Sequence, residues 1–277
     1  MNVLFTINKE QAEHVCVLIS SLRNHTDLNE PLNIYVIHTN LDDDDIIKLR
    51  KSAKNICITF IGEDLNYFIS AEPSDFPVDY NKYVRAFAYM LLPKSINRIL
   101  YLSYDTLVIN NISNFYESDF KDKAIIGCQL PILAKNSSNK SYLGLTDKDY
   151  FIDTGVMLMN LSFMRAVDFS EKMINFISSF DDVNRPDEQC IINLFYKDFI
   201  KNINYLVYNL GQSSLDLFNK NNSLIKYNLP LKAIKEYSAI LHFYDDEKPW
   251  MDTYDFSLKK LYKDAYNNYL SNHKINS

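Results

Sequence analysis

The fold is decided by NVLFTINKEQAEHVCVLISSL, residues 2–22, and by NIYVIH, residues 33–38. Residues 2–7 form an apolar run of strand length, and apolar side chains then recur at helical spacing. Asn8, with Gln11 three residues later, is a candidate cap for that helix. The second apolar run completes a strand–helix–strand unit, which is the building block of a parallel sheet.

The same alternation continues along the chain. The four acids at 42–45 precede another helical stretch, where acids complement the helix dipole, and this interpretation is favoured over a metal site. Further expected strands are residues 56–61, 98–102, 155–161 and 238–243, and further expected helices are residues 80–92, 169–180, 188–199 and 256–269. The pattern predicts an α/β fold, a Rossmann-like parallel sheet with helices on both faces. Ligands of such sheets bind beyond the carboxyl ends of the strands.

Composition excludes several classes of protein. The 277 residues are 47% hydrophobic and 23% charged, which allows a large core and excludes disordered and collagen-like chains. The net charge of −6, from 29 basic and 35 acidic side chains, argues against a nucleic-acid partner, which needs a basic face. The five glycines form neither GxGxxG nor GxxxxGKS/T. A bound phosphate would therefore be held by a metal or by a few basic side chains.

The cysteines and the N-terminus indicate the compartment. The four cysteines form no CxxC pair, and Cys16, Cys57 and Cys128 lie in apolar runs that predict buried thiols. The N-terminus has no basic region followed by a long apolar stretch, and no segment approaches the ~20 apolar residues that cross a bilayer. We therefore expect a soluble cytoplasmic protein in a reducing compartment.

Several polar residues at strand ends are candidates for chemistry. Asp105 follows an apolar strand and would project from the carboxyl edge of the sheet, although a single Asp there is more often a turn residue. His242 ends a late strand, with Lys248 six residues on; an imidazole can ligate a metal, and a lysine can neutralise a phosphate. Asp153 precedes a buried strand, where a turn residue is the alternative. The acids at 187–188 open a helix, where capping competes with a catalytic role.

Taken together and in this order, these segments resemble the retaining glycosyltransferases of family 8, which include bacterial lipopolysaccharide galactosyl- and glucosyltransferases and glycogenin. The resemblance spans roughly residues 1–251. NKYVRAFAYMLLP (81–93) is similar to a family helix with Tyr-x-Arg, RILYLSYDTLV (98–108) to YLDxDxxV, FIDTGVMLMNL (151–161) to FNxGVMLxNL, PDEQCIINLF (186–195) to PDQDxLNxLF, and HFYDDEKPW (242–250) to HFxGxxKPW.

The resemblance implies a GT-A fold and a nucleotide-sugar donor, usually a UDP-hexose. In the family both acids of Asp-x-Asp and the His of HFxGxxKPW hold Mn²⁺ (Mg²⁺ has similar chemistry), which implies Asp105 and His242 as metal ligands. The ion stabilises the charge that grows on the diphosphate as the sugar–phosphate bond breaks. The residues implied to bind the donor are Thr6 and Asn8 at the base and ribose, Arg85 at the phosphate or sugar, Ser103 and Tyr104 in the Asp-x-Asp run, and Lys248 at the diphosphate.

Two positions depart from the family pattern near the metal. Ser103 stands where the first acid of Asp-x-Asp belongs, so the site loses a charged ligand and the metal affinity should fall. Asp245 stands where HFxGxxKPW has glycine. We consider these changes a compensated exchange, a hypothesis in which Asp245 is a replacement metal ligand.

The expected catalytic residues on the sugar side are Asp153, Glu188 and Gln189. Asp153 replaces a family Asn near the reacting sugar. An ungapped alignment places Glu188 on the family's Gln, whereas a shift by one places Gln189 there, and both registers stay open. A Glu beneath the sugar is a competent nucleophile; the alternatives are stabilisation of an oxocarbenium-like state and same-face attack helped by the departing phosphate.

The expected function is retaining transfer of a hexose to a glycan, lipid-linked or protein acceptor; the alternative is a degenerate member that binds nucleotide-sugar or a partner without turnover. We expect residues 1–251 to form the GT-A domain and residues 252–277 an amphipathic helix packed on it or appended to it. Solvated lysines on that helix are the favoured interpretation, with peripheral contact at the inner face of the membrane as the alternative. The polar segment 134–149 is expected to be a loop or lid that contacts the acceptor.

Overall fold

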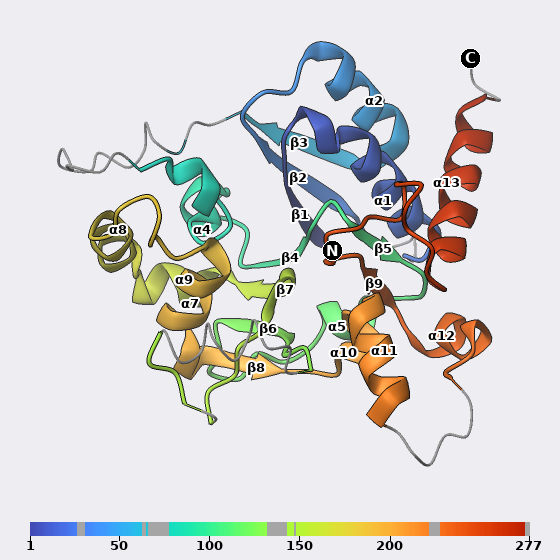
Figure 1. The fold of residues 1–277 in the computed structure, drawn as a ribbon. Helices are drawn as coiled ribbons and strands as arrows, with labels where there is room; N and C mark the ends of the chain where they lie inside the picture. The colour runs from blue at the N-terminus through green and yellow to red at the C-terminus, as the bar shows by residue number, and fades with distance from the viewer. Residues whose placement is uncertain are drawn as a thin grey trace.

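The computed structural model describes residues 1–26, 31–62, 65, 78–131, 143–146, 148–221 and 228–274. Within these ranges a seven-stranded sheet has the order β3-β2-β1-β4-β7-β6-β8 (Figure 1). Its strands are β1 (Asn2–Ile7), β2 (Asn33–His38), β3 (Cys57–Ile61), β4 (Arg98–Leu102), β6 (Ile125–Cys128), β7 (Asp153–Asn160) and β8 (Ile200–Asn202). A separate ribbon pairs β5 (Thr106–Val108) with β9 (Ile240–His242).

Helices cover both faces of this sheet, as the sequence predicts. They are α1 (Ala12–Asn24), α2 (Asp43–Ala53), α4 (Ala88–Leu91), α5 (Ser113–Tyr116), α7 (Leu161–Val167), α8 (Ser170–Ser178), α9 (Glu188–Phe195), α10 (Tyr205–Tyr208), α11 (Gln212–Asn221), α12 (Leu231–Tyr237) and α13 (Lys259–Lys274), with 3₁₀ turns η1 (Lys9–Gln11), η2 (Tyr80–Tyr83) and η3 (Lys197–Phe199). Successive strand residues point to opposite faces. Tyr101 and Met157 pack with α7, α8 and α9, whereas Leu102 and Val156 pack with α1 and α2.

Two helix starts form as the sequence predicts. The Asn8 side chain accepts from the Gln11 N–H at 3.2 Å, and the Gln11 side chain accepts from the Asn8 N–H at 3.0 Å. This capping box closes η1, which leads into α1. Asp42 and Asp45 form an equivalent box at the start of α2. The acids at 42–45 therefore begin a helix.

The sheet is mixed, which corrects the expectation of a parallel sheet. β1 to β4 pair in parallel, but β7 runs antiparallel to both β4 and β6. β7 is buried on both faces, so its apolar run carries no signal of direction. The reversal has a functional consequence, because the first residues of β7 lie beside the carboxyl end of β4. The Ser103 N–H donates to the Gly155 carbonyl at 2.8 Å across this junction.

The predicted helix at 80–92 is broken into η2 and the short α4, which is a second correction. The Glu188 carboxylate accepts the N–H groups of Arg85 (2.5 Å) and Ala86 (3.2 Å). These bonds compete with the carbonyls that would accept the same N–H groups in a continuous helix. A distant acid in α9 therefore reshapes this segment.

The C-terminal helix α13 runs beside α1 (Figure 1). Tyr262 Oη lies 3.1 Å from His14 Nδ1, and Leu261 shares a core cluster with Val17. The packing matches one of the two expected placements, and a division at residue 251 stays a prediction. No helix of the described part is long and apolar enough to span a membrane.

Two further sequence expectations concern the cysteines and the loop at 134–149. Cys16 and Cys128 are buried as predicted, but Cys57 is exposed. Cys57 begins the edge strand β3, where the alternation of side chains turns it outward. Most of the segment 134–149 lies outside the described residues.

Candidate active site

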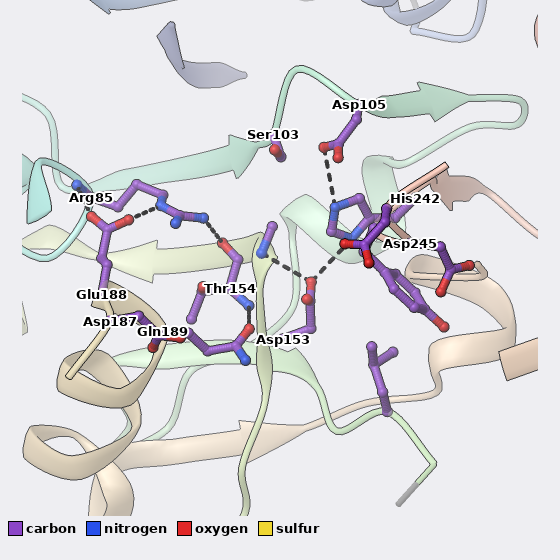
Figure 2. Close-up of a pocket in the computed structure, with 14 residues that line it drawn as sticks. Arg85, Ser103, Asp105, Asp153, Thr154, Asp187, Glu188, Gln189, His242 and Asp245 are labelled. Carbon is purple, nitrogen blue, oxygen red and sulfur yellow. Dashed lines mark hydrogen bonds and ion pairs between the residues drawn. The ribbon is translucent and has the colours of Figure 1, made fainter. Parts of the chain in front are cut away.

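An acid and an imidazole meet where β4 ends and β9 ends. β5 and β9 pair with Thr106 opposite His242, and Asp105 directly precedes β5. His242 Nε2 consequently lies 3.3 Å from Asp105 Oδ1 (Figure 2). Both side chains are buried and line a cavity of about 450 Å³. The central expectation from the sequence, an acid and a histidine in one cleft, is met by this geometry.

The opposite edge of the His242 ring faces Asp153 and Asn209. Nδ1 lies 3.1 Å from Asp153 Oδ1 and 2.9 Å from Asn209 Oδ1. The Asn209 amide and the Gly155 N–H each donate to the same Asp153 oxygen at 3.0 Å. Gly155 lies against the ring, since a Cβ there would be 2.1 Å from His242 Cε1. The ring is therefore enclosed by fixed polar partners and by bare backbone.

The neighbouring carboxylates set the charge of this cluster. Burial opposes a charged imidazole, but Asp153 and Asp105 outweigh burial and raise the pKa of His242 to about 10. Burial also opposes the charge of Asp105, yet His242 and Lys248 hold the pKa of that carboxyl well below its usual range. The pKa of Asp153 is lowered, against burial, by His242. These buried groups are therefore ionised together.

Lys248 reaches Asp105 from the loop after β9. Its Nζ donates to Asp105 Oδ2 at 2.8 Å and to the Phe243 carbonyl at 2.6 Å. Asp105 Oδ1 is buried and accepts no hydrogen bond in the described structure. One oxygen of Asp105 is thus neutralised by a lysine, and the other faces the imidazole.

Asp105 and His242 fit a divalent cation. Neighbouring octahedral ligands, each about 2.1 Å from an ion, lie roughly 3 Å apart. The separation of Asp105 Oδ1 and His242 Nε2 is close to this value, and the unpartnered carboxylate oxygen is a suitable donor for Mn²⁺ or Mg²⁺. Three or more His, Cys, Asp or Glu side chains do not gather as a metal cage anywhere in the described ranges. The protein would therefore supply two ligands and leave the other positions to substrate and water.

Asp245, the expected replacement ligand, lines the same cavity but is bound to α11. Its two oxygens accept from the Ser213 hydroxyl at 2.5 Å and the Ser213 N–H at 3.2 Å. Ser213 lies in the first turn of α11, where an acid complements the helix dipole. Metal ligation by Asp245 stays a prediction and requires Asp245 to leave Ser213.

Arg85 and Glu188 form a buried ion pair on the other side of the cavity (Figure 2). The Arg85 Nε–H donates to Glu188 Oε2, and its Nη1 donates to the Thr154 carbonyl at 3.3 Å. Burial raises the pKa of Glu188, and Arg85 opposes that rise. The Arg85 guanidinium also lies over the Tyr101 ring, 5.4 Å from its centroid.

The start of α9 separates capping from the residues that face the cavity. Asp187 is the cap, and its carboxylate accepts the Cys190 N–H at 2.8 Å. Gln189 Oε1 accepts the Thr154 N–H at 3.3 Å, and both Glu188 and Gln189 line the cavity. Because both face the cavity, their register against the family pattern stays open.

A second cavity of about 260 Å³ adjoins the first, and Arg85 and Ser103 line both. The expected base and ribose contacts Thr6 and Asn8 line this second cavity, together with Tyr104. Every residue expected at the site therefore lines one of the two cavities, except Lys248, which binds a residue that does. The cavities lie at the carboxyl ends of β1 and β4, where ligands of α/β sheets bind.

Sequence reasoning missed Asn209, Thr154 and Tyr244. Thr154 contributes only backbone contacts, to Arg85 and Gln189, so its side chain gives no signal. Tyr244 packs edge-on to His242 with a centroid separation of 5.4 Å. Asn209 is a completely buried polar residue, and its burial is visible only in the fold.

Comparison with known families decides the identity of this site. The family model for glycosyl transferase family 8 matches residues 2–254. The chain belongs to glycosyltransferase family 8. General stress protein A of Bacillus subtilis is 25% identical over 285 residues, which cover 100% of this chain and 95% of that protein. The lipopolysaccharide 1,2-glucosyltransferase of Escherichia coli is 23% identical over 278 residues, which cover 97% and 78%.

Solved structures share the fold. The galactosyltransferase LgtC, in complex with donor and acceptor sugar analogues, matches with a TM-score of 0.76 at 18% identity, over 97% of this chain and 96% of that one. An active-site mutant of LgtC matches with a TM-score of 0.77 at 19% identity and the same coverage. This family 8 enzyme therefore has the GT-A fold and is a glycosyltransferase.

Proposed function

We propose that this glycosyltransferase transfers a hexose from a nucleotide-sugar, a UDP-hexose, to a glycan acceptor with retention of configuration and with the help of a divalent metal. The observation that carries the proposal is the meeting of Asp105 and His242 at 3.3 Å beside the larger cavity. The LgtC complex with donor and acceptor sugar analogues supports the substrate class. The similarity to a lipopolysaccharide glucosyltransferase supports a hexose and a glycan.

Asp105 and His242 would hold Mn²⁺ or Mg²⁺ at the junction of β4 and β9. When bound, the ion neutralises the negative charge that develops on the diphosphate leaving group. Lys248 already lies on Asp105 and would donate to the diphosphate from the same position. Thr6 and Asn8 would bind the base and ribose in the smaller cavity.

Arg85 and Glu188 would bind the donor sugar, because Arg85 lines both cavities and Glu188 lines them with it. The Glu188 oxygens accept from two backbone N–H groups and from the Arg85 guanidinium, which fixes the carboxylate in one orientation. A fixed carboxylate near the anomeric carbon stabilises positive charge on the sugar in the transition state. Gln189 would contact sugar hydroxyl groups beside it.

A panel of nucleotide-sugars tests this function. We expect Mn²⁺-dependent hydrolysis of one UDP-hexose by the wild-type chain, and a loss of at least about 100-fold in Asp105→Asn and His242→Ala. Asp182→Asn, a substitution of an exposed acid, is the matched control and should retain full activity. NMR of the transferred sugar should show the donor's anomeric configuration. Absence of both hydrolysis and binding across the panel would contradict the proposal.

We also propose a cytoplasmic enzyme whose acceptor is a glycan, free or carried on a lipid or protein. The packing of α13 on α1 supports a C-terminal helix that belongs to the enzyme domain. Cell fractionation checks the compartment, and flotation with vesicles checks contact with the membrane. An enzyme that floats with vesicles would assign α13 a membrane role.

A further inference from the structure

We infer that Asp153 and Asn209 are positioning residues that hold His242 with Nε2 turned to Asp105, and that they thereby set the metal affinity of the site. The inference rests on the proposed metal-assisted function and extends it to residues behind the ligand. It assigns Asp153 a contact with the histidine in place of the expected contact with the sugar.

The hydrogen-bond directions around Nδ1 determine which nitrogen can bind a metal. The Asn209 amide nitrogen donates to Asp153, so the Asn209 oxygen is the atom that faces Nδ1 at 2.9 Å. The other neighbour of Nδ1 is the Asp153 carboxylate at 3.1 Å, which is also an acceptor. Nδ1 therefore carries a proton and donates it. The lone pair for a metal is left to Nε2, which faces Asp105 Oδ1.

Packing prevents the ring from adopting another orientation. Gly155 provides bare backbone on one side, where a Cβ would be 2.6 Å from Nε2, and Tyr244 lies edge-on to the ring. Asn209 is fully buried, and the Asp153 side chain is 13% exposed. Asp153 is itself fixed by the Gly155 N–H at the start of β7. Four separate contacts thus hold one imidazole.

Asp153 also supplies charge to a site that has little of it on the metal side. At the end of β4 only Asp105 offers a carboxylate, since Ser103 contributes a hydroxyl to the cavity. A carboxylate behind a ligating imidazole raises its basicity, and loss of such a partner typically weakens metal binding about 10- to 100-fold. The second negative charge therefore acts on the metal through His242.

Direct Mn²⁺ binding tests the inference. Free Mn²⁺ is measured by EPR during titration of the full chain in the presence of UDP. We expect about 10- to 100-fold weaker binding in Asp153→Ala and an intermediate loss in Asp153→Asn, which keeps an acceptor but removes the charge. Asn209→Ala should also weaken binding. Asp246→Asn removes an exposed acid from the same cavity and should change affinity less than about twofold, because an exposed charge is screened.

A merely structural role would give a different pattern. The melting temperature and the metal-free affinity for UDP should stay at wild-type values in Asp153→Asn, which is isosteric and keeps the inference testable even where Asp153→Ala fails to fold. Wild-type Mn²⁺ affinity in Asp153→Asn and Asn209→Ala overturns the inference. When His242→Ala nonetheless abolishes binding, the proposed metal-assisted function stands and the positioning role alone fails. A wild-type chain that binds no Mn²⁺ with UDP overturns both.

Discussion

At Gly155 the backbone lies directly against the catalytic cluster, and a Cβ would approach His242 Cε1 to 2.1 Å. The ring cannot move away freely, because its partners are buried. We expect Gly155→Ala to displace the imidazole from Asp105, to destabilise the fold by about 1–3 kcal/mol and to abolish Mn²⁺ binding. Thermal unfolding and EPR titration measure the two effects.

Gly127→Ala is the matched control for that substitution. Its Cβ would approach Ile152 Cδ1 to 2.6 Å, and that atom is the end of a flexible aliphatic side chain. A comparable loss of stability with retained Mn²⁺ binding is expected. Normal Mn²⁺ binding by Gly155→Ala would show that the ring tolerates displacement.

Ser103 offers a gain-of-affinity prediction at the same scale. It lines both cavities at the carboxyl end of β4, two residues before Asp105. A carboxylate at this position adds charge and a hard oxygen ligand, so Ser103→Asp is expected to tighten Mn²⁺ binding about tenfold. Ser103→Asn has a similar shape without the charge and should not tighten it. Equal affinities in the two variants would exclude position 103 from the metal site.

Among the elements, those with local signals were predictable from the sequence. β2 and β4 occupy the predicted residues, and both capping boxes form where Asn8 and Asp42 indicate. Asp105, His242 and Lys248 converge as expected, because the strands that carry them end at one edge.

Elements whose form depends on distant residues were not predictable. The direction of β7 is hidden by burial on both faces, and η2 and α4 replace a helix because Glu188, about 100 residues away, takes two of its N–H groups. Asn209 gives no local signal, because only the assembled fold buries it against His242. The chemistry of the site was therefore visible in the sequence, whereas the contacts that orient it were not.

The ion pair of Arg85 with Glu188 joins the 80–92 segment to α9, and its removal should destabilise both. Arg85→Ala leaves a buried carboxylate uncompensated, at an expected cost of about 3–5 kcal/mol. Burial already raises the pKa of Glu188 above its ordinary value of 4.5, and without Arg85 the pKa rises further. The folded state then binds a proton that the unfolded state releases, so the stability of the variant falls as pH rises.

The destabilisation of Arg85→Ala relative to wild type should therefore grow between about pH 5 and pH 8. Chemical denaturation at several pH values measures it. Arg85→Ala combined with Glu188→Gln removes both charges, and this double variant should be more stable than Arg85→Ala at high pH, with no such pH dependence. A pH-independent difference for the single variant would mean that Glu188 is solvated in the folded protein.

For the whole molecule, the two cavities sit where β1, β4, β7 and β9 meet, so ligands bound there connect segments from both ends of the chain. A ligand that binds only the folded state stabilises it, by about 2.7 kcal/mol at 100 times its dissociation constant. In a domain of this size, that energy raises the melting temperature by roughly 5–10 °C. We expect a small shift with UDP alone and the full shift with UDP and Mn²⁺ together.

The variant Asp105→Asn separates the two contributions to this shift. Thr6 and Asn8 lie in the smaller cavity, away from Asp105, so the shift caused by UDP alone should persist in the variant. The additional shift on adding Mn²⁺ should vanish, because the charged oxygen that faces His242 Nε2 is gone. A metal-dependent shift that survives in Asp105→Asn would place the cation elsewhere, with Asp245 as the next candidate for its ligand.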